Sequence, residues 1–452
     1  MLQLIDRRSR AVARAAARLG LALLVSGIAA AAASAQGTRL GSIYALARAS
    51  DAQFAAARAA AEAGREKLPQ ALAGLRPTVN LTHSVKRNRD GSTAFDDTLS
   101  YEAGTSAIVF TQPLFRVANR ANADQAEWQV LQAEQQLGLA EQDLMLRVSR
   151  VYFDVLQAGD ELAAATAQRE ALVQQLAQAR RSFEVGTVPI TDANEAQARH
   201  DLAVAQEIAA RNEIQSRRRV LERSIGGPSP ALARLKDDAQ VGWLGEDQQL
   251  ALVESAPRNS LAVQLARSAV GVADKEIAKR DAAHTPTLDL VASVGVNRNV
   301  NYGAFGGNDT RQASIGLEMS FPVYQGGGVS SRAREAIAER KRVGEELVQA
   351  ERQALLDAQQ AQLGLQTSVA LTQALRQALA SSESQLRSTQ RGQEVGIRTR
   401  VDVLNAQQQV YTTRRDLAGA RYRSLVSWLQ LKAAAGVLAA SDLRALDSLL
   451  AD

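Results

Sequence analysis

The chain has 452 residues and a formal net charge of +5, and it contains no cysteine. The absence of cysteine excludes disulfides, thiolate metal sites, a cysteine nucleophile and a lipidated N-terminal cysteine. Aromatic residues make up only 4% of the chain, while Ala, Leu, Val and Gln are abundant; this mixture favours long helices packed side by side over a compact globular core.

The first 35 residues have the features of a secretion signal. Five arginines precede an apolar stretch over 19–33, and Ala33-Ser34-Ala35 forms an A-x-A-type cleavage site. An apolar stretch of about 15 residues is short for a membrane-spanning helix, which needs about 20. Cleavage would remove five arginines and one aspartate and leave the mature chain near +1. The net charge therefore gives no support to nucleic-acid binding.

Proline positions predict the helices. Nine prolines occur, at positions 69, 77, 113, 189, 228, 230, 257, 286 and 322. Because helix interiors exclude proline, proline-free stretches with periodic Leu, Val and Ala predict long helices over 116–185 and 327–394. At 1.5 Å per residue each would be about 100 Å long. One helix is expected before the first strand, and further helices are predicted over 192–225, 258–283 and 402–436.

Four shorter stretches alternate apolar and polar residues and predict strands at about 77–87, 99–112, 286–297 and 312–322. In the first, Val79, Leu81 and Val85 alternate with polar residues. One apolar and one polar face is typical of membrane β-barrel strands, although a half-buried hairpin gives the same pattern. The polar connectors 88–98 and 298–311 are expected to be exposed hairpin loops. After residue 35 no apolar run of about 20 residues appears, which argues against a helical membrane protein.

The two halves of the chain repeat each other. Arg76-Pro77-Thr78-Val79 matches Thr285-Pro286-Thr287-Leu288 at an offset of 209, and Glu184-Val185-Gly186 matches Glu394-Val395-Gly396 at an offset of 210. We therefore expect one structural unit over 36–245, with a connecting segment from 226, a second unit over 246–438, and a C-terminal tail over 439–452. The two units together supply four strands.

Four strands cannot close a membrane barrel, since the smallest such barrels have eight. An open sheet edge is not viable in lipid, so other copies of the chain must supply the missing strands. The predicted fold is mostly α with a small β part. Three copies would form a trimeric twelve-stranded barrel continued by a long helical barrel.

At several places the sequence resembles the TolC family of outer-membrane efflux proteins. The turns over 183–192 and 393–405 resemble the family's two helix-tip motifs. The stretch 406–437 is similar to its final helix, and the segments 112–115 and 321–327 look like its strand-to-helix junctions. The resemblance covers roughly 37–438.

The resemblance implies a homotrimer in the cell outer membrane that extends into the periplasm. It would contact outer-membrane lipid, a periplasmic adaptor (membrane fusion protein) and an inner-membrane transporter of the RND, MFS or ABC type. The implied function is a passive exit duct for small-molecule efflux, type I protein secretion or both. The cargo stays open. The alternative is a soluble periplasmic coiled-coil adaptor, against which the four amphipathic strands argue.

The resemblance also assigns roles to the helix-tip residues. Asp402 would line the narrow inner end of the tunnel, with Asn405 on the same helix face, so that three copies form a ring of three carboxylates. Such a ring would repel itself and attract cations. Asp402 could equally cap the helix at a turn, and the two roles are compatible.

Arg398 would act as a gate latch by bonding to Thr191 and Asp192 of the neighbouring tip turn. Gln393 stands where the family has a companion tyrosine. The alternative is a solvated surface arginine.

The tip turns themselves are the expected adaptor contact, and their glycines fit helix ends that need a left-handed residue. These residues are Val185, Gly186, Thr187, Val395 and Gly396.

Nothing in the sequence indicates an enzyme. No H-E-x-x-H or G-x-S-x-G motif occurs. The three histidines lack ligand spacing, and the glycine run 326–328 lacks the Lys-Ser/Thr of a phosphate loop. We therefore expect no catalytic residue, cofactor, metal or nucleic-acid partner.

Overall fold

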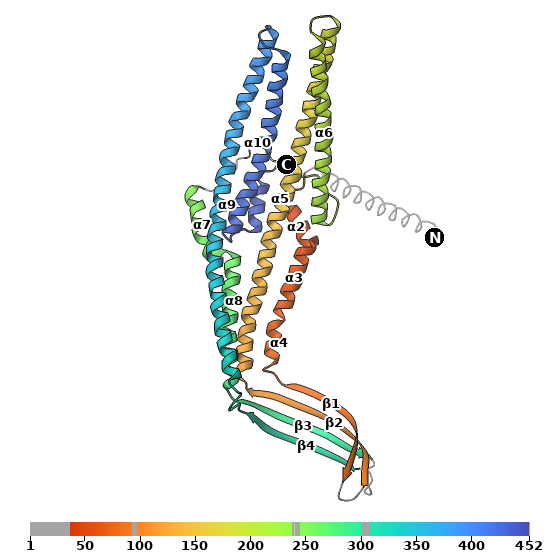
Figure 1. Ribbon diagram of the computed structural model, residues 1–452, viewed down its shortest axis with the longest axis vertical. Coiled ribbons are helices and arrows are strands. Elements are labelled where there is room, and N and C mark those ends of the chain that lie inside the picture. The colour runs from red at the N-terminus through yellow and green to blue at the C-terminus, as the bar shows by residue number, and fades with distance from the viewer. Residues whose placement is uncertain (1–36, 93–96, 237–238, 240–244, 301–307, 452) are drawn as a thin grey trace, which may run out of the picture. The chain divides into compact units, whose positions relative to one another are not determined.

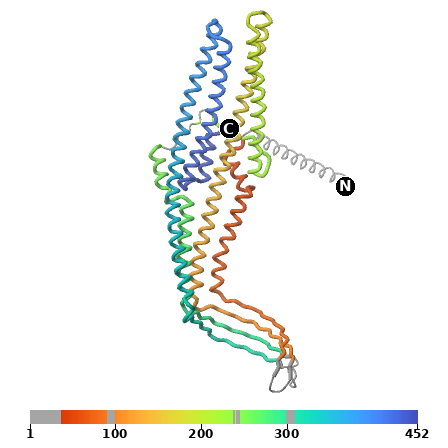
Figure 2. The backbone as a smooth tube through the Cα atoms, viewed as in Figure 1, coloured from red at the N-terminus to blue at the C-terminus, as the bar shows by residue number. Residues whose placement is uncertain are grey.

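The computed structural model describes residues 37–92, 97–236, 239, 245–300 and 308–451 (Figures 1 and 2). Two compact units are present, and each is described by itself. The first comprises the described parts of Met1–Ala55, Ala140–Ala256 and Leu355–Asp452. The second comprises Ala56–Leu139 and Pro257–Ala354.

The second unit contains a four-stranded antiparallel sheet in the order β1-β2-β3-β4 (Figure 1). Its strands are β1 (Thr78–Ser92), β2 (Asp97–Phe115), β3 (Thr287–Val300) and β4 (Asn308–Ser320). Each repeat supplies one hairpin, and β2 pairs with β3 to join the two repeats in one sheet.

The strands are longer than the sequence predicts, and the expectation of loops over all of 88–98 and 298–311 is wrong. Pairing continues to Ser92 opposite Asp97 and to Asn299 opposite Asn308. Ladder hydrogen bonds join backbone groups, so a polar segment can stay in a strand after its apolar alternation has ended. Only 93–96 and 301–307 separate the paired strands, and both lie outside the described residues.

The register gives the sheet one apolar and one polar face. Val79, Phe110, Ala292 and Ile315 lie opposite one another in a row across the four strands. Residues one position along each strand face the other way, and there Ser293 and Ser314 share a hydrogen bond of 2.9 Å. The apolar face is uncovered, as the 75% exposure of Ile315 illustrates. Covering it requires a partner or a membrane.

A charged pair joins the sheet to the first long helix. Arg116 stands between β2 and that helix, and its guanidinium donates through Nε and Nη2 to both carboxylate oxygens of Asp289 on β3, at 2.9 and 2.5 Å. The Asp289 residue is only 7% exposed. Two-point contacts of this kind fix direction as well as distance. Because donor and acceptor are both charged groups, these hydrogen bonds are stronger than bonds between neutral groups.

The long helices have nearly the bounds that the sequence predicts. They are α5 (Val117–Glu184), α6 (Ile190–Ile225), α8 (Leu261–Asp281), α9 (Gly328–Glu394) and α10 (Arg400–Ala434). Gly226 and Gly436, which follow α6 and α10 at the repeat offset of 210, have positive φ angles of 68° and 72°. The duplication therefore extends to the way these helices end. Among the described helices, none is both long and apolar enough for a membrane span.

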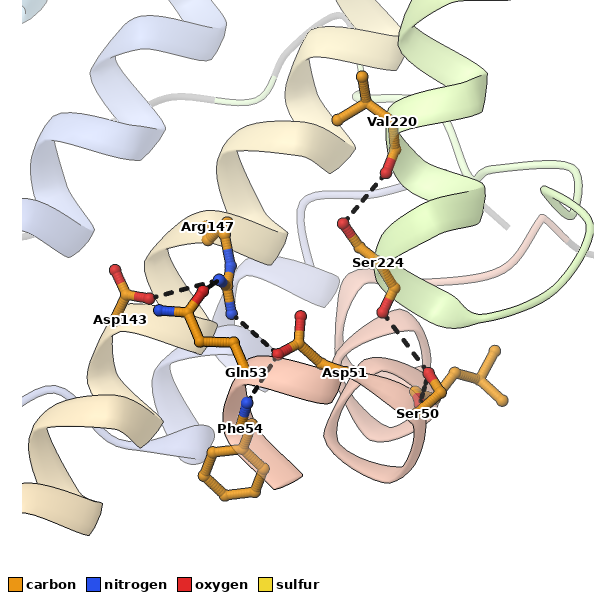
Figure 3. Close-up of polar contacts among 9 residues, drawn as sticks. Ser50, Asp51, Gln53, Phe54, Asp143, Arg147, Val220 and Ser224 are labelled. Atoms are coloured by element: carbon orange, nitrogen blue, oxygen red, sulfur yellow. Dashed lines mark hydrogen bonds and ion pairs between the residues drawn. The ribbon is translucent and has the colours of Figure 1, made fainter. Parts of the chain in front are cut away.

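The helix expected before β1 is divided into α2 (Leu40–Ser50), α3 (Ala52–Arg65) and α4 (Lys67–Ala73). Asp51 accounts for the first break, because its Oδ1 accepts from the Phe54 N–H of α3 at 2.8 Å (Figure 3). Arg147 on α5 holds the same carboxylate at 3.2 Å. An aspartate that caps the next helix favours a break over a continuous helix.

The described residues of the connecting segment and of the C-terminal tail pack within the first unit. Thr38 bridges to Leu232, and Leu235 bridges to Leu450. The buried Tyr152 hydroxyl donates to the Ala233 carbonyl at 2.9 Å. The expected tail holds α11 (Ala440–Asp447), and the second repeat begins with α7 (Glu246–Asn259), which includes Pro257. Pro257 has no N–H to donate to the carbonyl of Val253, and α7 ends two residues later.

Close helix packing in the second unit depends on glycine. A Cβ added to Gly271 of α8 would lie 2.4 Å from the Trp128 ring of α5.

We expect Gly271→Ala to lower the free energy of unfolding by about 1–3 kcal/mol, as overpacking does, measured by denaturant unfolding in detergent. Gly364→Ala is the matched control, because a Cβ there meets nothing within 4 Å. It should be neutral or stabilising by up to about 1 kcal/mol. Equal effects of the two changes would contradict the packing argument.

Candidate functional site

The two helix tips have the same backbone geometry. After α5, the Gly186 N–H donates to the Phe183 carbonyl and the Thr187 N–H donates to the Ser182 carbonyl, both at 2.9 Å. After α9, Gly396 and Ile397 make the equivalent bonds to Gln393 and Gly392, at 3.0 and 2.8 Å. This pair of bonds is the Schellman motif. Gly186 and Gly396 both have φ of 75°, a region that favours glycine.

The helices that follow the tips begin differently. Thr399 caps α10: its hydroxyl accepts from the Asp402 N–H at 3.2 Å, and the Asp402 carboxylate accepts from the Thr399 N–H at 3.0 Å. Pro189 occupies the equivalent position before α6 and makes no such cap. Proline has no N–H to donate, so Asp192 cannot complete the reciprocal box that Asp402 completes.

Asp402 therefore has the capping role that the sequence allowed for it. The Thr399 backbone N–H, followed by its hydroxyl, lowers the pKa of the Asp402 carboxyl. Three residues on, Asn405 accepts a hydrogen bond of 2.9 Å from Arg199 of α6. Arg199 also pairs with Glu195 at 3.0 Å. The α6 and α10 helices are thus linked one turn beyond the cap, by an arginine that the sequence did not single out.

The structure does not bring the proposed latch residues of one chain together. Arg398 is exposed, and its aliphatic part lies over Gly392 in its own tip turn. Within the described ranges, no hydrogen bond or ion pair joins it to Thr191 or Asp192 of the same chain. Thr191 and Asp192 lie in the first turn of α6, and the Gln393 carbonyl takes part in the second Schellman motif.

Amide side chains join α5 to α10. The Gln168 side chain donates to that of Gln408, and the Gln175 side chain donates to that of Gln407, each at 2.5 Å. Gln168 and Gln175 are seven residues apart and so share one helix face. We call these four residues the amide seam. The abundance of glutamine is visible in the sequence, but the partner of each glutamine is not.

The amide seam is loosely packed. Two cavities, of about 390 and 220 Å³, share Gln168, Gln206, Gln408 and Tyr411 in their walls. Leu172, Ala203 and Leu404 form a small apolar cluster beside them. Cavities of this size have room for water.

Two ion pairs link α5 to α6. Glu207 is 8% exposed and pairs with Arg169 of α5 at 2.6 Å and with Arg211 at 2.8 Å. Nearer the helix centre, Asp154 of α5 pairs with Arg217 at 3.2 Å, while burial raises the pKa of the Asp154 carboxyl. The equivalent helices α9 and α10 are joined by Arg414 and Glu383 at 2.8 Å, both exposed.

The polar groups of the described residues form no candidate metal centre. Among the residues that the structure describes, no three His, Asp or Glu side chains are grouped so that they could hold a metal ion. The polar groups at the tips instead form caps, turns and links between helices. This arrangement positions and joins helix ends rather than activating a substrate.

Comparison with known proteins identifies the family. The family model described as outer membrane efflux protein matches residues 43–227 and 252–437. The chain belongs to this family. The two matches begin 209 residues apart, so the duplication predicted from the sequence is confirmed.

Individual relatives agree with this assignment. The outer membrane protein TolC of Vibrio cholerae is 32% identical over 89% of this chain and 92% of its own length. The proteases secretion protein PrtF of Dickeya chrysanthemi is 32% identical over 91% of this chain and 90% of its own. The crystal structure of the outer membrane protein VceC of Vibrio cholerae has a TM-score of 0.73 at 18% identity, covering 88% of this chain and 96% of that one.

The protein is therefore an outer-membrane exit duct of the TolC type that extends into the periplasm, and the resemblance seen in the sequence is confirmed. Its relatives are channel proteins rather than enzymes. The alternative of a soluble adaptor is not supported.

The cap of α10 should respond to pH. A carboxyl whose pKa is lowered by folding stabilises above its ordinary pKa of about 4, and the effect is lost as the pH falls through the lowered value. We expect backbone amides in the first turns of α10 to exchange faster, relative to intrinsic rates, at pH 3 than at pH 7, as measured by hydrogen exchange.

Asp402→Asn should remove most of this dependence, because its neutral amide does not titrate. Asp192→Asn is the matched control, since Pro189 prevents a reciprocal cap there. If both variants change exchange at their helix starts equally, the cap is not the cause.

Proposed function

We propose that three copies of this chain close a twelve-stranded barrel and act together as a passive exit duct. The observation that carries the proposal is the sheet, whose one face is apolar and uncovered and whose outer strands are β1 and β4. In lipid the backbone groups along those two edges need partners. Pairing β1 of one copy with β4 of the next supplies them, and three copies make twelve strands.

The duct would receive its cargo from an inner-membrane transporter of the RND, MFS or ABC type through a periplasmic adaptor. The helix tips support an adaptor contact, since they expose apolar side chains: Val185 is 74%, Val395 is 69% and Ile397 is 80% exposed. Exposed apolar groups at such positions mark protein contacts. Relatives named for protease secretion support protein cargo, and a relative named for efflux supports small molecules.

The latch would form between copies. Arg398 is exposed and makes no bond to Thr191 or Asp192 of its own chain, which leaves its guanidinium available to the α5–α6 tip of a neighbour. The Asp402 carboxylates of three copies would then surround one axis, and each would keep its cap to Thr399. Asn405, held by Arg199, would add no charge to the ring.

The barrel proposal predicts that the two faces of β4 respond differently to charge. Ile315→Arg places a cation on the apolar face, where a mid-membrane arginine costs about 2–4 kcal/mol. We expect it to abolish the SDS-resistant trimer in the outer-membrane fraction, measured by unheated gel electrophoresis of fractionated cells.

Ser314→Arg is the matched control, because Ser314 is adjacent in sequence but lies on the polar face. It should assemble like the unaltered chain. A soluble monomer in the unaltered protein would overturn the proposal, as would normal assembly of Ile315→Arg.

The latch proposal predicts a leak. Arg398→Ser should raise the closed-state conductance of channels in planar bilayers several-fold, because each of three seams would lose a charged hydrogen bond worth about 1.5–3 kcal/mol. Arg387→Ser, a change at another exposed arginine of α9, should leave the conductance as it was. An unchanged closed-state conductance in Arg398→Ser would refute the latch.

A further inference from the structure

The apolar face of the sheet changes character toward its hairpin end. From the row that holds Leu288 and Met319 to the row that holds Val294 and Ala313, this face carries no charged residue. The next row along pairs Val296 with Arg311. From Leu288 to Val296 the strand rises about 26 Å at 3.3 Å per residue, close to the apolar band of about 25 Å that membrane barrels present.

Four arginines lie on this face from that row onward. Arg87 and Arg89 are on β1, Arg298 is on β3 and Arg311 is on β4, and all four are exposed. We call them the arginine collar. Glu102 and Asp309 share the face, and Asp309 pairs with Arg298 at 3.2 Å. Four positive and two negative charges leave a net charge of +2.

The opposite face differs at the same height. Over residues 82–88 of β1 and their paired positions, its one charged side chain among the described residues is Lys86. The arginines are thus gathered on the side that continues the apolar band. A purely solvated hairpin end would not need its arginines sorted to one face.

The collar is split between the two edges of the sheet. Arg87 and Arg89 are on edge strand β1, whereas Arg311 is on edge strand β4, with Arg298 diagonally beside it on β3. If copies close a ring as proposed above, β1 of one copy lies beside β4 of the next. Each of the three seams would then bring arginines from two copies together, and each site would be incomplete in a single chain.

We propose that the arginine collar binds the phosphate groups of anionic membrane lipid at each seam between copies. This inference rests on the proposed trimer and names a ligand for its outer surface. The guanidinium forks match phosphate oxygens two at a time. The uncovered apolar band beside them takes the acyl chains of the same molecule, which is why the ligand is a lipid rather than free phosphate.

The test uses the purified full-length trimer in detergent. The probe is lipid A, which carries phosphate groups on an acylated sugar, and the comparison ligands are dephosphorylated lipid A and inorganic phosphate. We expect lipid A to be retained in native mass spectrometry and to raise the temperature at which the SDS-resistant trimer dissociates, and we expect neither comparison ligand to do so. Changing all four arginines to Gln should weaken lipid A retention about tenfold or more, since it removes the cations that attract anionic lipid at the membrane surface.

Two controls separate charge from folding. Lys86→Gln removes a cation at the same height on the opposite face and should retain lipid A fully. Replacing the four arginines with Lys keeps the charge but removes the two-point guanidinium contacts. This variant should assemble and retain lipid A less well than the unaltered chain, which tests the collar if the Gln variant does not assemble. Undiminished retention by the Gln variant, or equal loss in Lys86→Gln, would overturn the proposal. So would binding of inorganic phosphate alone.

Failure of the proposed function would be seen separately. It would appear as the absence of any trimer in the unaltered protein before lipid is added. A stable trimer that ignores lipid A refutes only the collar.

Discussion

The backbone groups along the free edges of β1 and β4 impose the constraint on which the rest of the molecule depends. Nothing in lipid can hydrogen-bond them except another strand, and the described part of the chain supplies four strands in one sheet. The duplication provides the even number of strands and their common apolar face. The two charged features of the sheet both lie outside its apolar band. Arg116 neutralises Asp289 on the polar face, and the arginines of the opposite face begin only where the apolar band ends.

Much of the helical architecture could be predicted from the sequence because proline and glycine mark its boundaries. Pro113, Pro189 and Pro322 lie just before long helices, and Gly186 and Gly396 end two of them through the same Schellman motif. These are local effects, set by a missing N–H or by a positive φ. The duplication doubled each signal. Family membership and the exit-duct function could be inferred from the tip motifs, because these motifs are also local and occur twice.

The remaining features depend on partners that are distant in the chain. The strand ends could not be placed, because paired backbones continue to Ser92 and Asp97 after the alternation stops. Arg116 and Asp289 are 173 residues apart, and nothing local marks either as a partner of the other. The break at Asp51 was missed because its neighbours are good helix formers, although an aspartate that can cap is a signal in its own right. Arg199 was missed because its partner Asn405 lies in the other repeat.

The contacts within and between the two helix hairpins differ in kind, and the difference bears on which of them separates first. Removing a partner of the buried Glu207 would leave a charge without compensation, which costs about 3–5 kcal/mol, so the α5–α6 hairpin resists separation. Near the tips, the contact of α5 with α10 includes two neutral amide pairs, each worth about 1 kcal/mol, beside cavities with room for water to replace them. Farther along α5, the Tyr422 hydroxyl of α10 donates to Asp160 at 2.6 Å. Amides exchange a protein partner for water at little cost. Separating the helices at the amide seam therefore costs less than breaking the ion pairs around the buried Glu207.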